Sequence, residues 1–186
     1  MRRLSWLLVA LWPAACGPLP PPVDSARLPP GLFGTLDQDM AAVLYAQVAF
    51  ASAARTYGNP AEGALAALAL EYEAGALNTS PRWAYVPAIT QLQLLQARIE
   101  MRAAAGIAPG APSQAVVDAL AGAIKALRNG DAAAAMAALR SPAFTGTPEA
   151  TLRKLANLPY LQVANVATAR AAEAITTDDD RGESSR

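Results

Sequence analysis

Apolar residues recur at helical spacing through most of the chain. The clearest stripe comprises Val116, Val117, Leu120, Ile124 and Leu127. A second stripe comprises Leu36, Met40, Val43, Leu44 and Val48. Both follow the 3.6-residue period of an amphipathic helix. No stretch between residues 35 and 176 combines strict alternation with β-branched residues, so the pattern predicts helices and no sheet.

Residues that favour helix starts stand at regular intervals. Thr35 and Gln38 have the spacing of a capping box, and Asn59 precedes a proline that suits the first helical turn. With further start signals before 81, 113, 131 and 148, they predict six helices, over 36–57, 60–75, 81–105, 113–128, 131–139 and 148–176. Pro87 and Pro159 interrupt two of these, where we expect a kink or a new helix start.

Composition supports the same architecture. Alanine makes up about a quarter of the 186 residues, and alanine is the strongest helix former. We therefore predict an all-α fold, a single alanine-rich helical bundle of about six helices over 35–176. A chain of this length buries enough surface for one stable domain.

The N-terminus has the pattern of an export signal. Two arginines follow Met1, an apolar run extends from Leu4 to Trp12, and small residues precede Cys16. The run is too short to span a bilayer. The segment resembles the signal of bacterial lipoproteins, with residues 1–15 as the signal peptide, although Pro13 stands where that class prefers an aliphatic residue. The resemblance implies that Cys16 carries a lipid and becomes the mature N-terminus.

The same resemblance implies a location. The chain would be anchored in the bacterial cell envelope and face the periplasm, and Gly17 in place of aspartate favours the outer membrane. Residues 16–34 hold six prolines, which favour extended polyproline II, so we predict a tether outside the domain. At the other end, 177–186 contains three adjacent aspartates without the spacing of a calcium loop, which predicts a disordered acidic tail.

Several chemistries are excluded by what the chain lacks. It has no histidine and one cysteine, which rules out histidine-based triads, histidine zinc sites and clusters held by four cysteines. No glycine-rich phosphate loop occurs, so we expect no cofactor and no metal site. Ten acidic and ten basic residues between 35 and 176 leave the domain neutral, which argues against binding to nucleic acid.

Carboxylates are the remaining candidates for catalysis. Glu71, Glu73 and Glu100 are candidates for acid and base work on polysaccharide. Glu71 and Glu73 are two residues apart on a helix and point in different directions. The preferred interpretation of all three is a solvated helix face, because charged residues are usually exposed.

Three functions remain open from the sequence. The preferred hypothesis is a non-enzymatic, lipid-anchored interaction module, an accessory or assembly factor for a membrane-associated protein complex. One alternative is a carboxylate-only enzyme that acts on cell-wall or exported polysaccharide. The other is a carrier of an apolar ligand, since helical domains form cavities between helices.

The segment 81–105 shows two apolar strips. The broader one, expected to face the core, comprises Tyr85, Ile89, Leu92, Leu95 and Ile99. The opposite strip comprises Leu94, Ala97, Met101 and Ala105. Two interpretations of it stay open: this helix is central and packed on both sides, or the strip is an exposed surface on which a protein partner docks.

Overall fold

The computed structural model describes residues 23–34 and 37–183, and within them the fold is all-helical. The seven α-helices are α1 (Gln38–Phe50), α2 (Pro60–Thr79), α3 (Ala88–Ala105), α4 (Ser113–Arg128), α5 (Ala132–Ala138), α6 (Pro148–Leu155) and α7 (Gln162–Glu183). Two short 3-10 helices, η1 (Ala53–Arg55) and η2 (Pro81–Trp83), follow α1 and α2. The prediction of an all-α bundle is confirmed.

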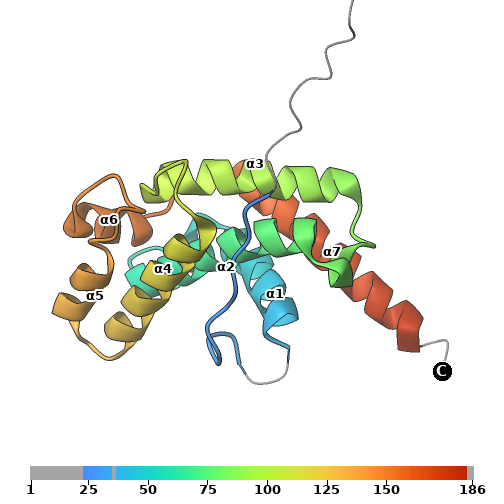
Figure 1. Ribbon diagram of the computed structural model, residues 1–186, viewed down its shortest axis with the longest axis horizontal. Helices are drawn as coiled ribbons and strands as arrows, with labels where there is room; N and C mark the ends of the chain where they lie inside the picture. Colours follow the sequence, from blue (N-terminus) through green and yellow to red (C-terminus); the bar gives the residue numbers. More distant parts are fainter. Residues whose placement is uncertain (1–22, 35–36, 184–186) are drawn as a thin grey trace, which may run out of the picture.

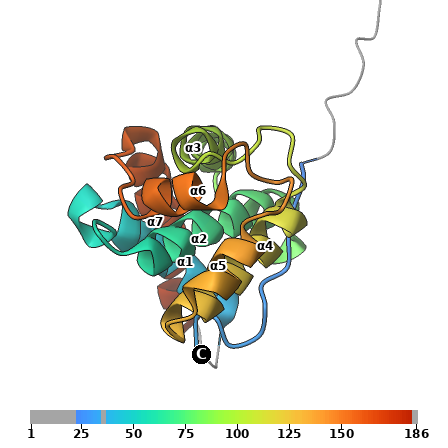
Figure 2. The ribbon, with the colours of Figure 1, turned by 90° about the vertical axis from the view of Figure 1, so that its left-hand side faces the viewer.

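Helix α2 forms the centre of the bundle. Every residue from Gly63 to Leu77 is buried, and α2 contacts α1, α3, α4 and α6. It runs through the middle of the molecule in both ribbon views (Figures 1 and 2). Its many alanines let neighbouring helices approach closely. At Gly63 a side chain would not fit, because a Cβ there would lie 1.8 Å from the carbonyl oxygen of Leu155 in α6.

Most of the expected helix starts are present. The side chains of Asn59, Asp131 and Thr147 accept hydrogen bonds from backbone amides in the first turns of α2, α5 and α6. The N-cap of α1 differs from the prediction. Asp37 caps that helix by accepting from the amide of Met40, whereas the predicted cap, Thr35, lies outside the described residues.

The prolines end and begin helices as expected. Helix α3 starts at Ala88, after Pro87, and the long helix predicted over 148–176 is divided into α6 and α7, with Pro159 between them. The first helix is shorter than predicted, because α1 ends at Phe50 and η1 follows.

The prediction of a disordered tail from Thr177 is wrong as far as Glu183, where α7 ends. Ile175 is the last residue of α7 that is described as buried, and the helix continues beyond it. The hydroxyls of Thr176 and Thr177 also bond to carbonyls one turn earlier, which satisfies these side chains inside the helix. Residues 184–186 lie outside the described residues.

Residues 23–33 form an N-terminal strap that packs on the bundle. The carboxylate of Asp24 accepts from the amide of Ser113 at 2.5 Å, and the amide of Arg27 donates to the Gln114 side chain at 2.8 Å. Ala26 is buried, and a Cβ on Gly75 of α2 would lie only 2.7 Å from Cα of Ser25. Figure 1 shows the strap in blue, running from α3 past α2.

The prediction that residues 16–34 form a tether outside the domain is therefore wrong for 23–33. A proline-rich backbone lacks internal hydrogen bonds, but its remaining amides and carbonyls can pair with side chains of a neighbouring helix. The side chain of Gln114 in the first turn of α4 supplies both partners for Arg27, because it accepts from the amide and donates to the carbonyl of that residue. The predicted tether from 16 to 22, including Cys16, lies outside the described residues.

Candidate interaction surfaces

The strip considered for partner docking on α3 is part of the core. The side chains of Leu94, Ala97, Met101 and Ala105 have no exposed surface and belong to the main hydrophobic cluster. The interpretation of these four residues as an exposed docking strip is therefore wrong. They lie on the side of α3 that packs on the bundle, where α3 contacts α2 and α7.

The opposite strip of α3, expected to face the core, is the exposed one. Ile89 and Leu92 are each 59% exposed and Ile99 is 60% exposed. Tyr85, just before the helix, is exposed as well, and only Leu95 is half-buried. The assignment of this strip to the core is therefore wrong, and α3 is packed on one side only.

Polar residues that flank the buried strip explain this choice. On one flank, Gln91 donates to the carbonyl of Leu77 in α2. On the other, the carboxylate of Glu100 accepts from the amide of Ala164 in the first turn of α7. These two hydrogen bonds can form only when the strip that contains Leu94 and Met101 faces the bundle. The small side chains of Ala97 and Ala105 also let backbones approach closely.

Helix α7 extends the exposed apolar surface. Glu100 contacts Ala164 near one end of α3, and Arg170 donates to Gln93 nearer the other end, so α3 and α7 run antiparallel side by side. Val163 and Val166 of α7 are 41% and 38% exposed.

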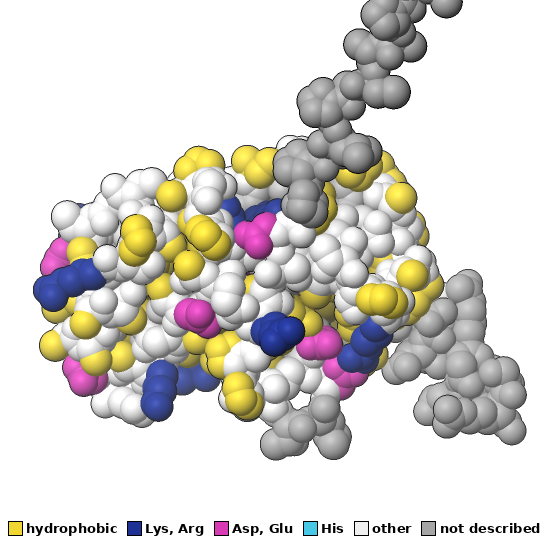
Figure 3. All heavy atoms as spheres, in the orientation of Figure 1, with side chains coloured by type: hydrophobic (Ala, Val, Ile, Leu, Met, Phe, Trp, Pro, Cys, Tyr) yellow, Lys and Arg dark blue, Asp and Glu magenta, His cyan; other side chains and the backbone are white. Residues whose placement is uncertain are grey.

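We call Ile89, Leu92, Ile99, Val163 and Val166 the α3–α7 face. Hydrophobic side chains lie along the upper edge of Figure 3, where α3 lies in Figure 1.

A buried polar cluster lies at the junction of α2, α3 and α4. The guanidinium of Arg102 donates to both carboxylate oxygens of Glu71, at 2.9 and 2.5 Å. The hydroxyl of Ser113 donates to the same carboxylate at 2.6 Å. Glu71 is fully buried and Arg102 is 7% exposed. The charge of Glu71 is thus neutralised and its hydrogen bonds are satisfied inside the protein.

This cluster also holds the strap. Arg98 donates to the carbonyl of Asp24 at 2.9 Å and to the hydroxyl of Ser113 at 3.3 Å. Ser113 therefore joins the strap to the buried pair, through its backbone amide on one side and its hydroxyl on the other. Burial lowers the pKa of Arg98, and the nearby charge of Glu71 counteracts this.

The interpretation of the three glutamates as a solvated face is wrong for two of them. Glu71 and Glu73 are both fully buried, whereas Glu100 is half-buried and caps α7. Glu73 points to a different side of α2 from Glu71. Neither of its carboxylate oxygens has a hydrogen-bond partner among the described residues. Burial raises the pKa of Glu73 well above the usual value of 4.5.

The raised pKa of Glu73 makes stability dependent on pH. Above about pH 4.5 the unfolded chain loses this proton while the folded protein keeps it. The free energy of unfolding then falls by up to about 1.4 kcal/mol per pH unit, until the pH reaches the folded pKa. We expect Glu73→Gln to lack this fall, so that its stability relative to the parent grows as the pH rises.

Urea unfolding from acid to neutral pH measures this difference. Glu173→Gln, which changes an exposed carboxylate of α7, is the matched control and should follow the parent curve. Parallel curves for the parent and Glu73→Gln would mean that Glu73 ionises normally in the folded protein.

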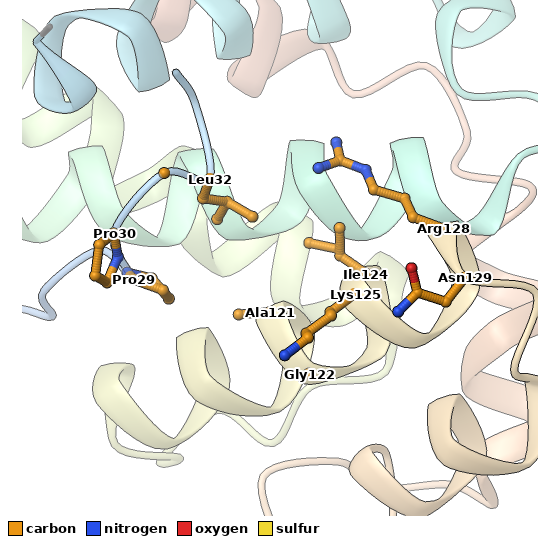
Figure 4. Close-up of a pocket in the computed structure, with 10 residues that line it drawn as sticks. Pro29, Pro30, Leu32, Ala121, Gly122, Ile124, Lys125, Arg128 and Asn129 are labelled. Atoms are coloured by element: carbon orange, nitrogen blue, oxygen red, sulfur yellow. The ribbon is translucent and has the colours of Figure 1, made fainter. Parts of the chain in front are cut away.

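A groove of about 400 Å³ lies between the strap and α4. Figure 4 shows Pro29, Pro30 and Leu32 of the strap on one side of it and the last turns of α4 on the other. The half-buried Pro29 and Leu32 and the exposed Pro30 contribute apolar surface, and Ile124 lies buried at the α4 side. We call this the strap–α4 groove.

Two cations and an amide lie at the α4 side of this groove. Lys125, Arg128 and Asn129 line it and are exposed. Among the residues that the structure describes, neither Lys125 nor Arg128 forms an ion pair. The groove thus combines an apolar lining with positive charge at its edge. This groove could not be predicted from the sequence, because Lys125 and the strap prolines are nearly 100 residues apart.

The described residues contain no group of three or more acidic or cysteine side chains placed to hold a metal ion. Over 23–34 and 37–183, none of the helices has the length and hydropathy needed to cross a membrane. Comparisons with protein-family models, curated proteins and solved structures found no match to this chain.

Proposed function

We propose that this chain is a lipid-anchored module of the bacterial envelope that acts by binding another protein. The lipoprotein-like signal that ends at Cys16 supports the anchor. In this proposal Cys16 carries the lipid, the domain faces the periplasm, and the outer membrane is the favoured location. The strap–α4 groove supports the binding function.

The observation that carries the proposal is the chemistry of the groove. Apolar side chains stabilise a ligand by removing its apolar surface from water, and the positive charges of Lys125 and Arg128 favour a carboxylate at the edge. Pro29 and Pro30 stiffen the strap side, so little conformational entropy is lost on binding. The best-fitting partner is an extended protein segment that carries apolar side chains and an acidic group.

Two alternatives receive different support. A carboxylate-only enzyme would have to use residues other than the three glutamates considered, because Glu71 is paired, Glu73 is enclosed and Glu100 caps α7. A carrier of an apolar ligand is favoured by the apolar lining of the same groove. Such a ligand without an anionic group would not need Lys125 and Arg128.

Charge reversal at the groove tests the proposal. A photocrosslinking amino acid at Asn129 should capture a partner in intact cells, and Lys125→Glu with Arg128→Glu should reduce that crosslink at least about tenfold through charge repulsion. Arg55→Glu with Arg140→Glu makes the same change in net charge at exposed sites outside the groove. This control should leave the crosslink intact.

Two results would count against the proposal. A crosslink that survives charge reversal, or one that the control pair weakens equally, would show that the groove is not the binding site. An apolar small molecule retained in native mass spectra of both the parent and the reversed variant would favour the carrier instead.

A further inference from the structure

The α3–α7 face has no partner within the described bundle. Its side chains are aliphatic and uncharged, and their exposed fractions range from 38% to 60%. Among the described residues, the other large apolar side chains that are exposed are Tyr85 and Tyr160, which precede α3 and α7, and Val48 and Tyr57, which lie on α1 and after η1. Large apolar side chains that gather on two neighbouring helices indicate a surface that is covered in the working protein.

The place where the strap begins indicates what covers this face. Asp24, the second residue of the strap, is held at α3, because Arg98 of that helix donates to its backbone carbonyl. Figure 1 shows the described chain beginning beside α3 and then leading away from it past α2. The N-terminal side of the domain is therefore the α3 side.

The chain upstream of the strap is short. Six residues, 17–22, separate Cys16 from Val23. A chain spans at most about 3.6 Å per residue, so Cys16 lies no more than about 25 Å from Val23. A folded domain of this size is roughly 40 Å across. A lipid on Cys16 would thus hold the α3 side of the domain close to the membrane.

We infer that the α3–α7 face lies on the surface of the lipid bilayer, an inference that rests on the proposed lipid anchor. Ile89, Leu92 and Ile99 enter the boundary between headgroups and acyl chains, and Val163 and Val166 contact it beside them. Aliphatic side chains at this depth gain from leaving water, as in helices that lie in the membrane interface. The five side chains of the face carry no charge, and the two exposed charged residues beside Ile89, Arg170 and Glu173, have opposite signs, so the contact with lipid depends little on ionic strength.

This orientation also places the partner-binding groove. The strap runs from α3 toward the opposite side of the bundle (Figure 1), and its Pro29 and Leu32 line the strap–α4 groove. With α3 on the lipid, the strap–α4 groove points away from the membrane. The acyl anchor alone would leave the domain free to rotate, whereas the anchor and the face together fix its direction.

Fluorescence quenching by brominated lipid tests the inference on the lipidated protein. The protein is purified from bacterial membranes and reconstituted into vesicles of phosphatidylethanolamine and phosphatidylglycerol with brominated acyl chains. Ile99→Trp places a probe in the α3–α7 face, and Tyr57→Trp places a matched probe at a side chain that is 74% exposed elsewhere. The parent contributes the same background from Trp83, the one tryptophan after the signal peptide.

We expect the added emission of the Ile99→Trp variant to shift to the blue and to fall at least about twofold in brominated vesicles, at low and high salt alike. The added emission of the Tyr57→Trp variant should change little. If both variants float with the vesicles but are quenched equally, this inference is overturned while the anchor stands. A blue-shifted but unquenched probe in the Ile99→Trp variant reports burial against protein and also overturns it. If neither variant floats, the proposed anchor fails, and the inference fails with it.

Discussion

Replacing Arg102 by methionine lowers the free energy of unfolding by about 3–5 kcal/mol, because it leaves the carboxylate of Glu71 charged and buried without its main partner. Methionine keeps most of the side-chain volume. The loss of stability therefore comes mainly from the missing charge partner of Glu71 and only to a small extent from a cavity. Urea unfolding at neutral pH measures the effect. Ser113 and Arg98 remain near Glu71 but offer it weaker compensation, since Arg98 lies 3.8 Å from the carboxylate.

Removing both charges separates this explanation from simple loss of packing. We expect Glu71→Leu combined with Arg102→Met to recover a large part of the lost stability, because a buried pair can be replaced by apolar groups at little cost. The double-mutant cycle gives the coupling free energy between the two side chains. If the double variant were as unstable as the sum of the two single variants, the pair would not be coupled.

Leu94→Asp should destabilise the domain by at least about 4 kcal/mol, because an aspartate there is buried without a partner. The matched control is Leu92→Asp on the same helix, two residues earlier, where the side chain is 59% exposed. We expect that variant to stay within about 0.5 kcal/mol of the parent. Thermal unfolding of both variants measures the contrast.

This comparison decides which side of α3 packs on the bundle. If Leu92→Asp unfolded the protein and Leu94→Asp did not, the broader apolar strip would face the core, as the hydrophobic pattern alone suggests. Similar losses for both variants would mean that α3 is packed on two sides.

Local signals predicted the helices well. Asn59, Asp131 and Thr147 cap helices where they were expected, and Pro87 and Pro159 mark real boundaries. These signals act over a few residues, so they can be read from a single chain. Four of the five residues of the predicted stripe on α4, Val116, Val117, Leu120 and Ile124, are fully buried, and the fifth, Leu127, is half-buried.

The choice of face on α3 could not be made from periodicity. That helix has two apolar strips, and the width of a strip does not determine which one packs inward. The deciding contacts join Gln91 to Leu77 and Glu100 to Ala164, residues 14 and 64 positions apart. Such contacts depend on the tertiary arrangement, although the polar residues on both flanks of the narrow strip were visible in the sequence.

The buried Glu71–Arg102 pair and the contact of the strap with α4 could not be predicted from the sequence for the same reason. Glu71 pairs with Arg102, 31 residues away, and the strap reaches Ser113 across 89 residues. Charged residues are exposed far more often than buried, which favoured a solvated position for Glu71 and Glu73. Only a partner brought close by the fold makes burial of Glu71 tolerable.

The intact mass of the mature protein extracted from bacterial membranes tests the proposed anchor, on which the orientation of both surfaces depends. We predict a chain that begins at Cys16, lacks residues 1–15 and carries the added mass of a diacylglyceryl group. The Cys16→Ser variant should lack that mass and leave the detergent phase. A mature chain with an unmodified Cys16, or with an N-terminus at another residue, would contradict the account.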